Sequence, residues 1–69
     1  MKIVVHILPT RKERRVLDLK KGALAEDAIR ALGLYPDGWI PVRNEQPIPL
    51  DEPLTEGDEI KLVSVVSGG

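Results

Sequence analysis

Apolar and β-branched residues are arranged in the first part of the chain in a pattern that predicts a β-hairpin. Residues 2–8 (Lys-Ile-Val-Val-His-Ile-Leu) are dense in β-branched side chains, which favour extended structure. Residues 9–12 contain a proline and interrupt this run. Residues 13–19 (Glu-Arg-Arg-Val-Leu-Asp-Leu) predict a second strand, which ends before Gly22. The two strands are close enough in sequence to pair directly.

One helix is predicted after the hairpin, at residues 23–32. Its apolar positions recur at the spacing of a helical stripe: Ala25, Ala28, Ile29 and Leu32. Glu26 and Asp27 lie in the first turn, where the helix dipole favours negative charge. Gly33 is placed to form the C-terminal cap. No Ser, Thr, Asp or Asn precedes Ala23, so packing has to compensate for a weak N-cap.

The second half of the chain begins with short extended segments separated by turns. Residues 35–38 (Tyr-Pro-Asp-Gly) predict a turn, and residues 39–43 predict a short strand. Pro41 in this strand has no N–H to donate, so it must lie at an edge or on the unpaired side. Another turn, a short extended piece and a connection are predicted in succession at residues 44–46, 47–50 and 51–58.

The last strand is predicted at residues 59–66, and its pattern of apolar and polar residues changes after Leu62. Ile60 and Leu62 alternate with Glu59 and Lys61, which indicates one buried and one wet face. Beyond Leu62 we expect apolar groups on both faces, from Val63, Val65 and Val66. Exposed apolar groups often mark partner surfaces, so we expect Val63 and Val66 to help dock a partner. The alternative is that they only complete the sheet and contact the helix.

The order of elements, ββαββ(β), predicts an α+β fold. One helix covers only one face of a sheet, so we expect a mixed sheet of four or five strands with the helix packed across one face. If the first and last strands lie side by side in the middle, they must run parallel. The domain is expected to span residues 1–66, followed by a flexible diglycine tail at residues 67–69.

Composition excludes several classes of function. The 69 residues contain no cysteine, which excludes disulfides, thiolate metal sites and a cysteine nucleophile. His6 is the only histidine and lacks companions for a metal site, so a structural or surface role is expected. The net charge of −1 argues against a nucleic-acid partner. Without a membrane span or signal peptide, we expect a cytoplasmic monomer with no bound metal or cofactor.

The chain ends Ser67-Gly68-Gly69, directly after the apolar run. Glycine adds no side chain to a core and is costly to order, so two terminal glycines do not stabilise the fold. They do provide a thin, extended peptide whose free carboxylate can enter a narrow channel, with Ser67 as a small spacer. The alternative is a frayed end that happens to be glycine.

Together, these segments resemble the ubiquitin-fold sulfur carriers ThiS and MoaD and their archaeal small-modifier relatives. The resemblance covers essentially the whole chain. Its most specific part is the Gly57-Asp58-Glu59-Ile60 turn into the last strand, followed by Gly68-Gly69 at the end. The family fold is the β-grasp, or ubiquitin-like fold, which agrees with the architecture predicted above.

The resemblance implies a function for the carboxylate of Gly69. In this family an ATP-dependent activating enzyme adenylates the terminal glycine, and a sulfur donor converts it to a thiocarboxylate. A downstream enzyme then accepts the sulfur for thiamin, molybdopterin or tRNA. In the modifier branch the activated glycine is joined instead to a lysine amine. This chain has no phosphate-binding glycine loop and no nucleophile–base pair, so it is expected to be a substrate and carrier, not an enzyme.

A third hypothesis is a non-covalent interaction or RNA-binding β-grasp module with incidental glycines. The near-neutral charge argues against it, and an adaptor has no reason to end at Gly69. Trp39 is expected either at the edge of the core or on the exposed sheet face, where it would be a docking residue.

Two charged groups complete the candidates. The basic run at the first hairpin is interpreted as a solvated turn, with contact to an acidic partner or RNA as the alternative: Arg11, Lys12, Arg14 and Arg15. The acidic cluster is interpreted as solvation and turn chemistry, with Asp58 bonding backbone amides and contact with an activating enzyme as the alternative: Asp51, Glu52, Glu56, Asp58 and Glu59.

Overall fold

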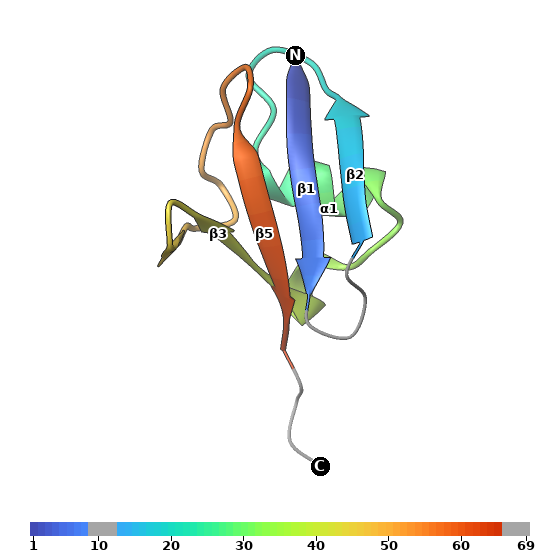
Figure 1. Ribbon diagram of the computed structural model, residues 1–69, viewed down its shortest axis with the longest axis vertical. Coiled ribbons are helices and arrows are strands. Elements are labelled where there is room, and N and C mark those ends of the chain that lie inside the picture. Colours follow the sequence, from blue (N-terminus) through green and yellow to red (C-terminus); the bar gives the residue numbers. More distant parts are fainter. Residues whose placement is uncertain (9–12, 66–69) are drawn as a thin grey trace.

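The first and last strands lie side by side and run parallel inside a five-stranded mixed sheet (Figure 1). The computed structural model describes residues 1–8 and 13–65. The inner strands are β1 (Lys2–Leu8) and β5 (Glu59–Ser64), and β2 (Glu13–Asp18) pairs antiparallel with β1. On the other side β5 pairs antiparallel with β3 (Trp39–Arg43), which pairs with the two-residue β4 (Gln46–Pro47). This arrangement confirms the predicted parallel centre.

The helix α1 (Ala25–Ala31) packs across one face of this sheet and closes the core. Alternate residues of β1 and β5 point toward it, because successive strand side chains face opposite sides. The buried core is entirely aliphatic: Ile3, Val5, Ile7, Ala25, Ala28, Ile29, Leu54, Ile60 and Leu62. The other face, here called the open face, has no covering element among the described residues. The structure therefore confirms an α+β fold with the helix on one side.

Both ends of α1 are capped, but by different means. At the N-terminus the carbonyls of Leu50 and Glu52 accept the N–H groups of Glu26 and Ala25, each at 2.9 Å. These long-range bonds satisfy amides that have no partner inside the helix. Asp27 adds a local acceptor for the N–H of Leu24 at 2.8 Å, so hydrogen bonds, and not only the predicted packing, compensate for the weak N-cap. At the C-terminus Gly33 has φ +77° and closes the helix, with its N–H donating to the carbonyl of Arg30 at 2.9 Å.

The segment after α1 sets the position of β3. A short 3₁₀ helix, η1 (Pro36–Gly38), leads directly into the strand. Pro41 lies opposite Leu62 of β5, and its carbonyl accepts the N–H of Ile48 at 2.9 Å on the side away from β5. Because the N and C=O of one strand residue point to the same side, the missing N–H of Pro41 also faces away from β5. Its predicted place on the unpaired side is thus confirmed.

A two-residue turn, Asn44–Glu45, connects β3 to β4. Both residues have positive φ, 54° and 66°, which is the backbone of a type I′ hairpin turn. Asparagine tolerates this conformation, whereas glutamate is strained there. The exposed Glu45 carboxylate lies 3.1 Å from the Lys61 ammonium.

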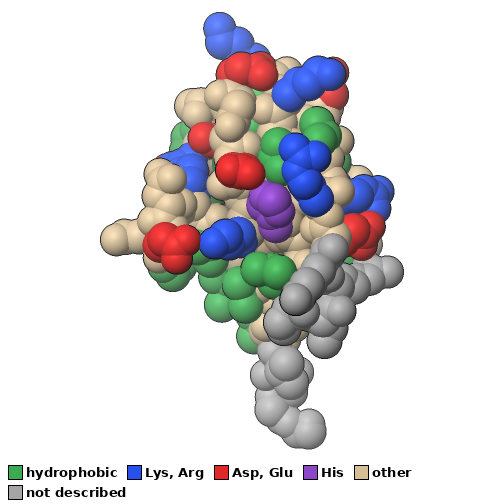
Figure 2. Space-filling view, viewed as in Figure 1, with side chains coloured by type: hydrophobic (Ala, Val, Ile, Leu, Met, Phe, Trp, Pro, Cys, Tyr) green, Lys and Arg blue, Asp and Glu red, His purple; other side chains and the backbone are tan. Residues whose placement is uncertain are grey.

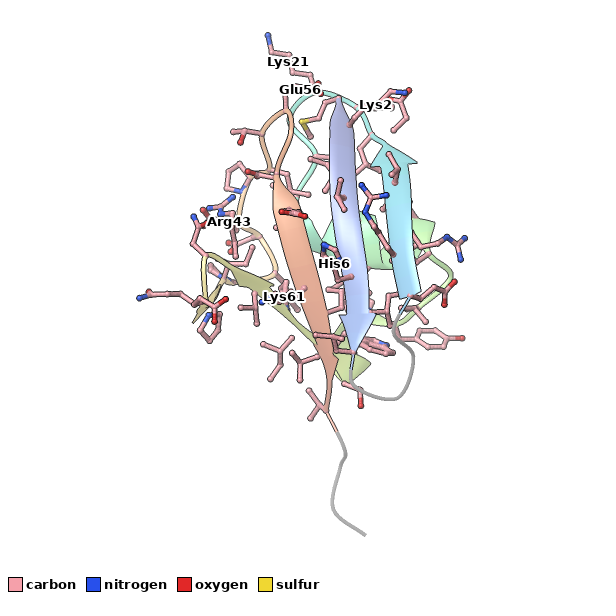
Figure 3. The ribbon with its side chains drawn as sticks, viewed as in Figure 1. Lys2, His6, Lys21, Arg43, Glu56 and Lys61 are labelled. Carbon is pink, nitrogen blue, oxygen red and sulfur yellow. The ribbon has the colours of Figure 1, made fainter. Side chains whose placement is uncertain are left out.

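The connection between β4 and β5 is held by ionic and backbone hydrogen bonds. Arg43 donates to Asp58 Oδ2 at 3.0 Å and also to Glu52. The Thr55 N–H donates to Asp58 Oδ2 at 2.8 Å, which confirms the predicted role of Asp58 as an acceptor for backbone amides. At the end of the sheet where β1 begins, Glu56 accepts the N–H of Lys2 at 3.2 Å (Figure 3).

These contacts shift the pKa of one carboxyl group in the connection, that of Asp58. Partial burial acts to raise the pKa of Asp58, but hydrogen bonds from Thr55 and the Arg43 guanidinium outweigh it and hold that pKa below its ordinary value of 3.8. Among residues 1–8 and 13–65, no helix has the length and apolarity needed to cross a membrane.

The Asn44–Glu45 turn generates a first prediction. Glu45→Gly should raise the free energy of unfolding by up to about 1 kcal/mol, because glycine adopts positive φ without the Cβ clash. Urea unfolding would measure this change. Glu45→Gln is the matched control, since it removes the ion pair with Lys61 but keeps the strained backbone. If the glycine variant is no more stable than the glutamine variant, the turn stores no such strain.

The lowered pKa of Asp58 generates a second prediction. Asp58→Asn should lower the free energy of unfolding by about 1–3 kcal/mol near pH 7, because a charged acceptor for Thr55 and Arg43 is lost. The folded pKa lies below the unfolded one, so this contribution is present above the unfolded value and is lost as the pH falls through the folded value. The gap between wild type and variant should therefore shrink below about pH 4.

Urea unfolding over a pH series would measure that gap. Asp51→Asn is the control, because Asp51 is exposed and no hydrogen bond or ion pair is seen for it among the described residues. A gap that persists unchanged at the acid end of the series would contradict the assignment.

Candidate functional site

The end of β5 leads into the residues that the sequence singles out for chemistry. Val66, Ser67, Gly68 and Gly69 lie outside the described residues, so the predicted docking role of Val66 and the tail itself remain predictions. The last described residue is Val65, whose N–H donates to the carbonyl of Gly38 at 2.9 Å. Pairing between the final strand and the β3 segment thus continues up to this point.

Exposed apolar side chains gather on the open face beside this end of β5 (Figure 2). Val63 lies between Leu8 of β1 and Ile40 of β3, directly opposite both in register. Ile40, Val63 and Val65 have exposed fractions of 41%, 37% and 44%, and Leu8 is half-buried. We call these four residues, Leu8, Ile40, Val63 and Val65, the apolar end of the open face.

The structure shows which face of the sheet the side chains of β3 and β5 occupy. Val63 and Val65 both continue the exposed side of the alternation in β5. The expectation of apolar groups on the second face depends on Val66, which lies outside the described residues. Ile40 likewise faces outward as the partner of Val63. Leu8 and Ile40 were not among the predicted docking residues, because only the strand register brings them beside Val63.

Trp39 takes the first of its two predicted positions. It lies opposite Ser64, is half-buried, and packs against the core on the side of the helix. It is therefore at the edge of the core and not on the open face. Its predicted contact with a partner remains a hypothesis about its exposed portion.

The middle of the open face is polar. His6 Nε2 lies 3.0 Å from Glu59 Oε2, and because a carboxylate can only accept, Nε2 carries the hydrogen. Figure 3 labels His6 on β1 and Lys61 on the neighbouring β5. A shallow depression of about 240 Å³ is lined by His6, Val42, Asn44, Glu45, Glu59 and Lys61. His6 is thus half-buried on the open face. The described residues contain no group of three or more potential metal ligands.

The predicted basic run divides between the two faces of the sheet. Arg11 and Lys12 lie outside the described residues. Arg14 pairs in register with His6 and therefore points to the open face. Arg15 points to the other side, where its guanidinium lies 2.7 Å from the Glu13 carboxylate. Of the two described members of this run, only Arg14 is thus available to a partner on the open face.

Solved structures with this arrangement confirm the ubiquitin-like β-grasp fold. SAMP1 from Haloferax volcanii superposes with a TM-score of 0.76 at 23% identity over the whole of both chains. The ubiquitin of Caldiarchaeum subterraneum superposes with a TM-score of 0.77 at 18% identity, covering this whole chain and 98% of that one. Both likenesses concern the fold alone.

Sequence comparison identifies the family. The sulfur carrier protein TtuB of Thermus thermophilus is 32% identical over 69 residues, the whole of both chains. An uncharacterized protein of Archaeoglobus fulgidus is 35% identical over 48 residues, 70% of each chain. The model of the ThiS family matches residues 5–69, a range that includes the terminal diglycine. The chain therefore belongs to the ThiS family, whose members are sulfur carriers and not enzymes.

Proposed function

We propose that this chain carries sulfur on the carboxylate of Gly69. An activating enzyme transfers AMP from ATP to a carboxylate oxygen and releases pyrophosphate. A sulfur nucleophile from a donor then attacks the carbonyl carbon, AMP leaves, and a thiocarboxylate remains. The carrier delivers this sulfur to a downstream enzyme, for thiamin, molybdopterin or tRNA sulfur transfer.

The observation that carries this proposal is the family match, which runs through Gly69. A carboxylate resists nucleophiles until its oxygen becomes part of a good leaving group, and AMP supplies one. The chain has no cysteine and no phosphate-binding glycine loop, so activation requires a partner that holds ATP. The folded body then serves to present the tail to that partner.

The apolar end of the open face is the proposed docking surface for the activating enzyme. Val63 lies at its centre, beside Leu8 and Ile40, and the strand that carries it leads to the reactive tail. Burying such exposed apolar area is a common source of binding energy. Val66 and the exposed part of Trp39 are proposed to contribute at its border, while Ser67 and Gly68 form the narrow neck before Gly69.

Conjugation to protein lysines would use the same activated carboxylate. In that reaction an amine attacks the carbonyl carbon, AMP leaves and an amide forms in place of the thiocarboxylate. The difference lies only in the acceptor, so the products distinguish the two functions.

Intact-mass spectrometry of the protein from its native host provides the third prediction. We expect a population whose mass has increased by the exchange of one oxygen for one sulfur, and deletion of Gly69 should abolish it. Branched peptides on the lysines of other proteins would instead identify a modifier. If the Gly69 deletion leaves either product unchanged, the proposed chemistry is wrong.

The docking surface generates a fourth prediction. Val63→Thr keeps the side-chain shape but adds a hydroxyl to the proposed contact, which should cost about 1–2 kcal/mol and raise the KM of activation about 5- to 30-fold. Pyrophosphate release with ATP and the activating enzyme would measure it. The matched control is Val16→Thr, because Val16 is also an exposed strand valine, at 53%, but lies on β2 away from the apolar end. Equal effects of both substitutions would refute the docking assignment.

A further inference from the structure

Three basic side chains form one row across the open face. His6 on β1 lies directly opposite Arg14 on β2 and directly opposite Lys61 on β5. We call Arg14, His6 and Lys61 the basic row. In the space-filling view, blue Lys or Arg side chains lie on either side of the purple histidine near the centre of the face (Figure 2).

The members of this row differ in whether the fold supplies them with an acidic neighbour. Glu59 lies 3.0 Å from His6, and Glu45 lies 3.1 Å from Lys61, so two members have an acidic neighbour. Arg14 is exposed and makes no ion pair with any of the described residues. A charged group with no structural partner is free to bind one from outside.

The basic row lies close to the proposed docking surface on the same face of the sheet. Leu8 is the second residue after His6 along β1, and Val63 is the second residue after Lys61 along β5. At about 3.3 Å per residue, the basic row and the apolar end are about 7 Å apart on one face. A protein that covers Val63 and its neighbours would therefore also approach Arg14 and Lys61.

We propose that the protein docking on the apolar end presents carboxylates to the basic row. This inference rests on the proposed function, because it takes the docking partner to be the activating enzyme. An apolar patch bordered by charges is the usual composition of a protein interface, in which the charges select the partner and accelerate association. The open face thus has two parts, one supplying apolar contact and one supplying charge recognition.

An acidic protein fits these observations better than RNA does. Phosphate-backbone binding usually requires a basic excess over a large surface, whereas this chain has a net charge of −1. The row contains no Phe, Tyr or Trp, the larger aromatic side chains on which bases stack.

The test compares Arg14→Gln with Arg30→Gln in the activation assay at low and high salt. Arg30 is an exposed arginine on α1, on the other side of the molecule, and pairs with Glu26 at 2.6 Å. Both variants change the net charge equally. We expect Arg14→Gln to raise the KM about three- to tenfold at low salt with kcat unchanged, because a charge at an interface mainly affects association. Arg14→Lys should restore most of the loss.

Salt and a second variant extend the test. The effect of Arg14→Gln should disappear at about 0.5 M NaCl, where charges are screened within a few ångströms. Lys61→Gln should behave in the same way, and thermal melting should show that both variants are folded. Equal KM values for Arg14→Gln and Arg30→Gln, or an effect that persists at high salt, would overturn the acidic-partner assignment.

Two other results would refute the inference by different routes. Wild-type protein that releases no pyrophosphate with its activating enzyme would refute the proposed function itself. Arg14-dependent binding of a fluorescent single-stranded RNA, together with an unchanged KM for Arg14→Gln, would assign the row to RNA.

Discussion

Parallel pairing of β1 with β5 is the constraint on which the rest of this structure depends. Parallel neighbours cannot be joined by a tight turn, so the chain between them must cross over from one end of the sheet to the other. In this protein the crossover contains the helix that closes the core and the β3–β4 hairpin that extends the sheet. The same pairing brings the C-terminal ends of both strands to the same end of the sheet, where Leu8 and Val63 are neighbours. The core and the proposed docking surface therefore have a common origin.

A chain this short has few ways to hold such a crossover in place. The segment before β5 does so through backbone hydrogen bonds as well as through apolar packing of Ile48, Leu50 and Leu54. Carbonyls of Leu50 and Glu52 cap the helix, and Gly57 donates to the carbonyl of Lys2 at 2.9 Å beside the start of β1. Arg43 adds a link from β3 through its hydrogen bonds to Glu52 and Asp58. Leu54 is the one residue of this segment in the buried core. These contacts fix the place where β5 begins and thereby position the whole strand.

The sequence predicted the local features of the fold and the parallel centre of the sheet, but not the faces of the short strand at residues 39–43. The strands at both ends, the helical stripe and the Gly33 cap depend on residues close together in the chain, so their patterns were readable. The faces of Ile40 and Trp39 were not, because a five-residue strand interrupted by Pro41 has too little alternation to reveal its orientation. Pairing with β5 and the positive-φ turn at Asn44–Glu45 determine that orientation. Part of the N-terminal cap was likewise hidden, because the carbonyls of Leu50 and Glu52 lie more than twenty residues away, although Asp27 also accepts the N–H of Leu24 locally.

The same distinction applies to the candidate site. The Gly69 carboxylate was suggested by the terminal motif and the family resemblance, and its chemistry needs no particular neighbour within this chain. The surface around Val63 does need neighbours, and Leu8, Ile40 and Arg14 come from three other parts of the sequence. A sheet covered by a single helix must leave its second face to solvent or to a partner. Because alternate residues of each strand serve the two faces, Leu62 can stay in the core while Val63 remains on the open face. The carrier function proposed here needs only this division: one face to hold the fold together and one face left for the proposed partner.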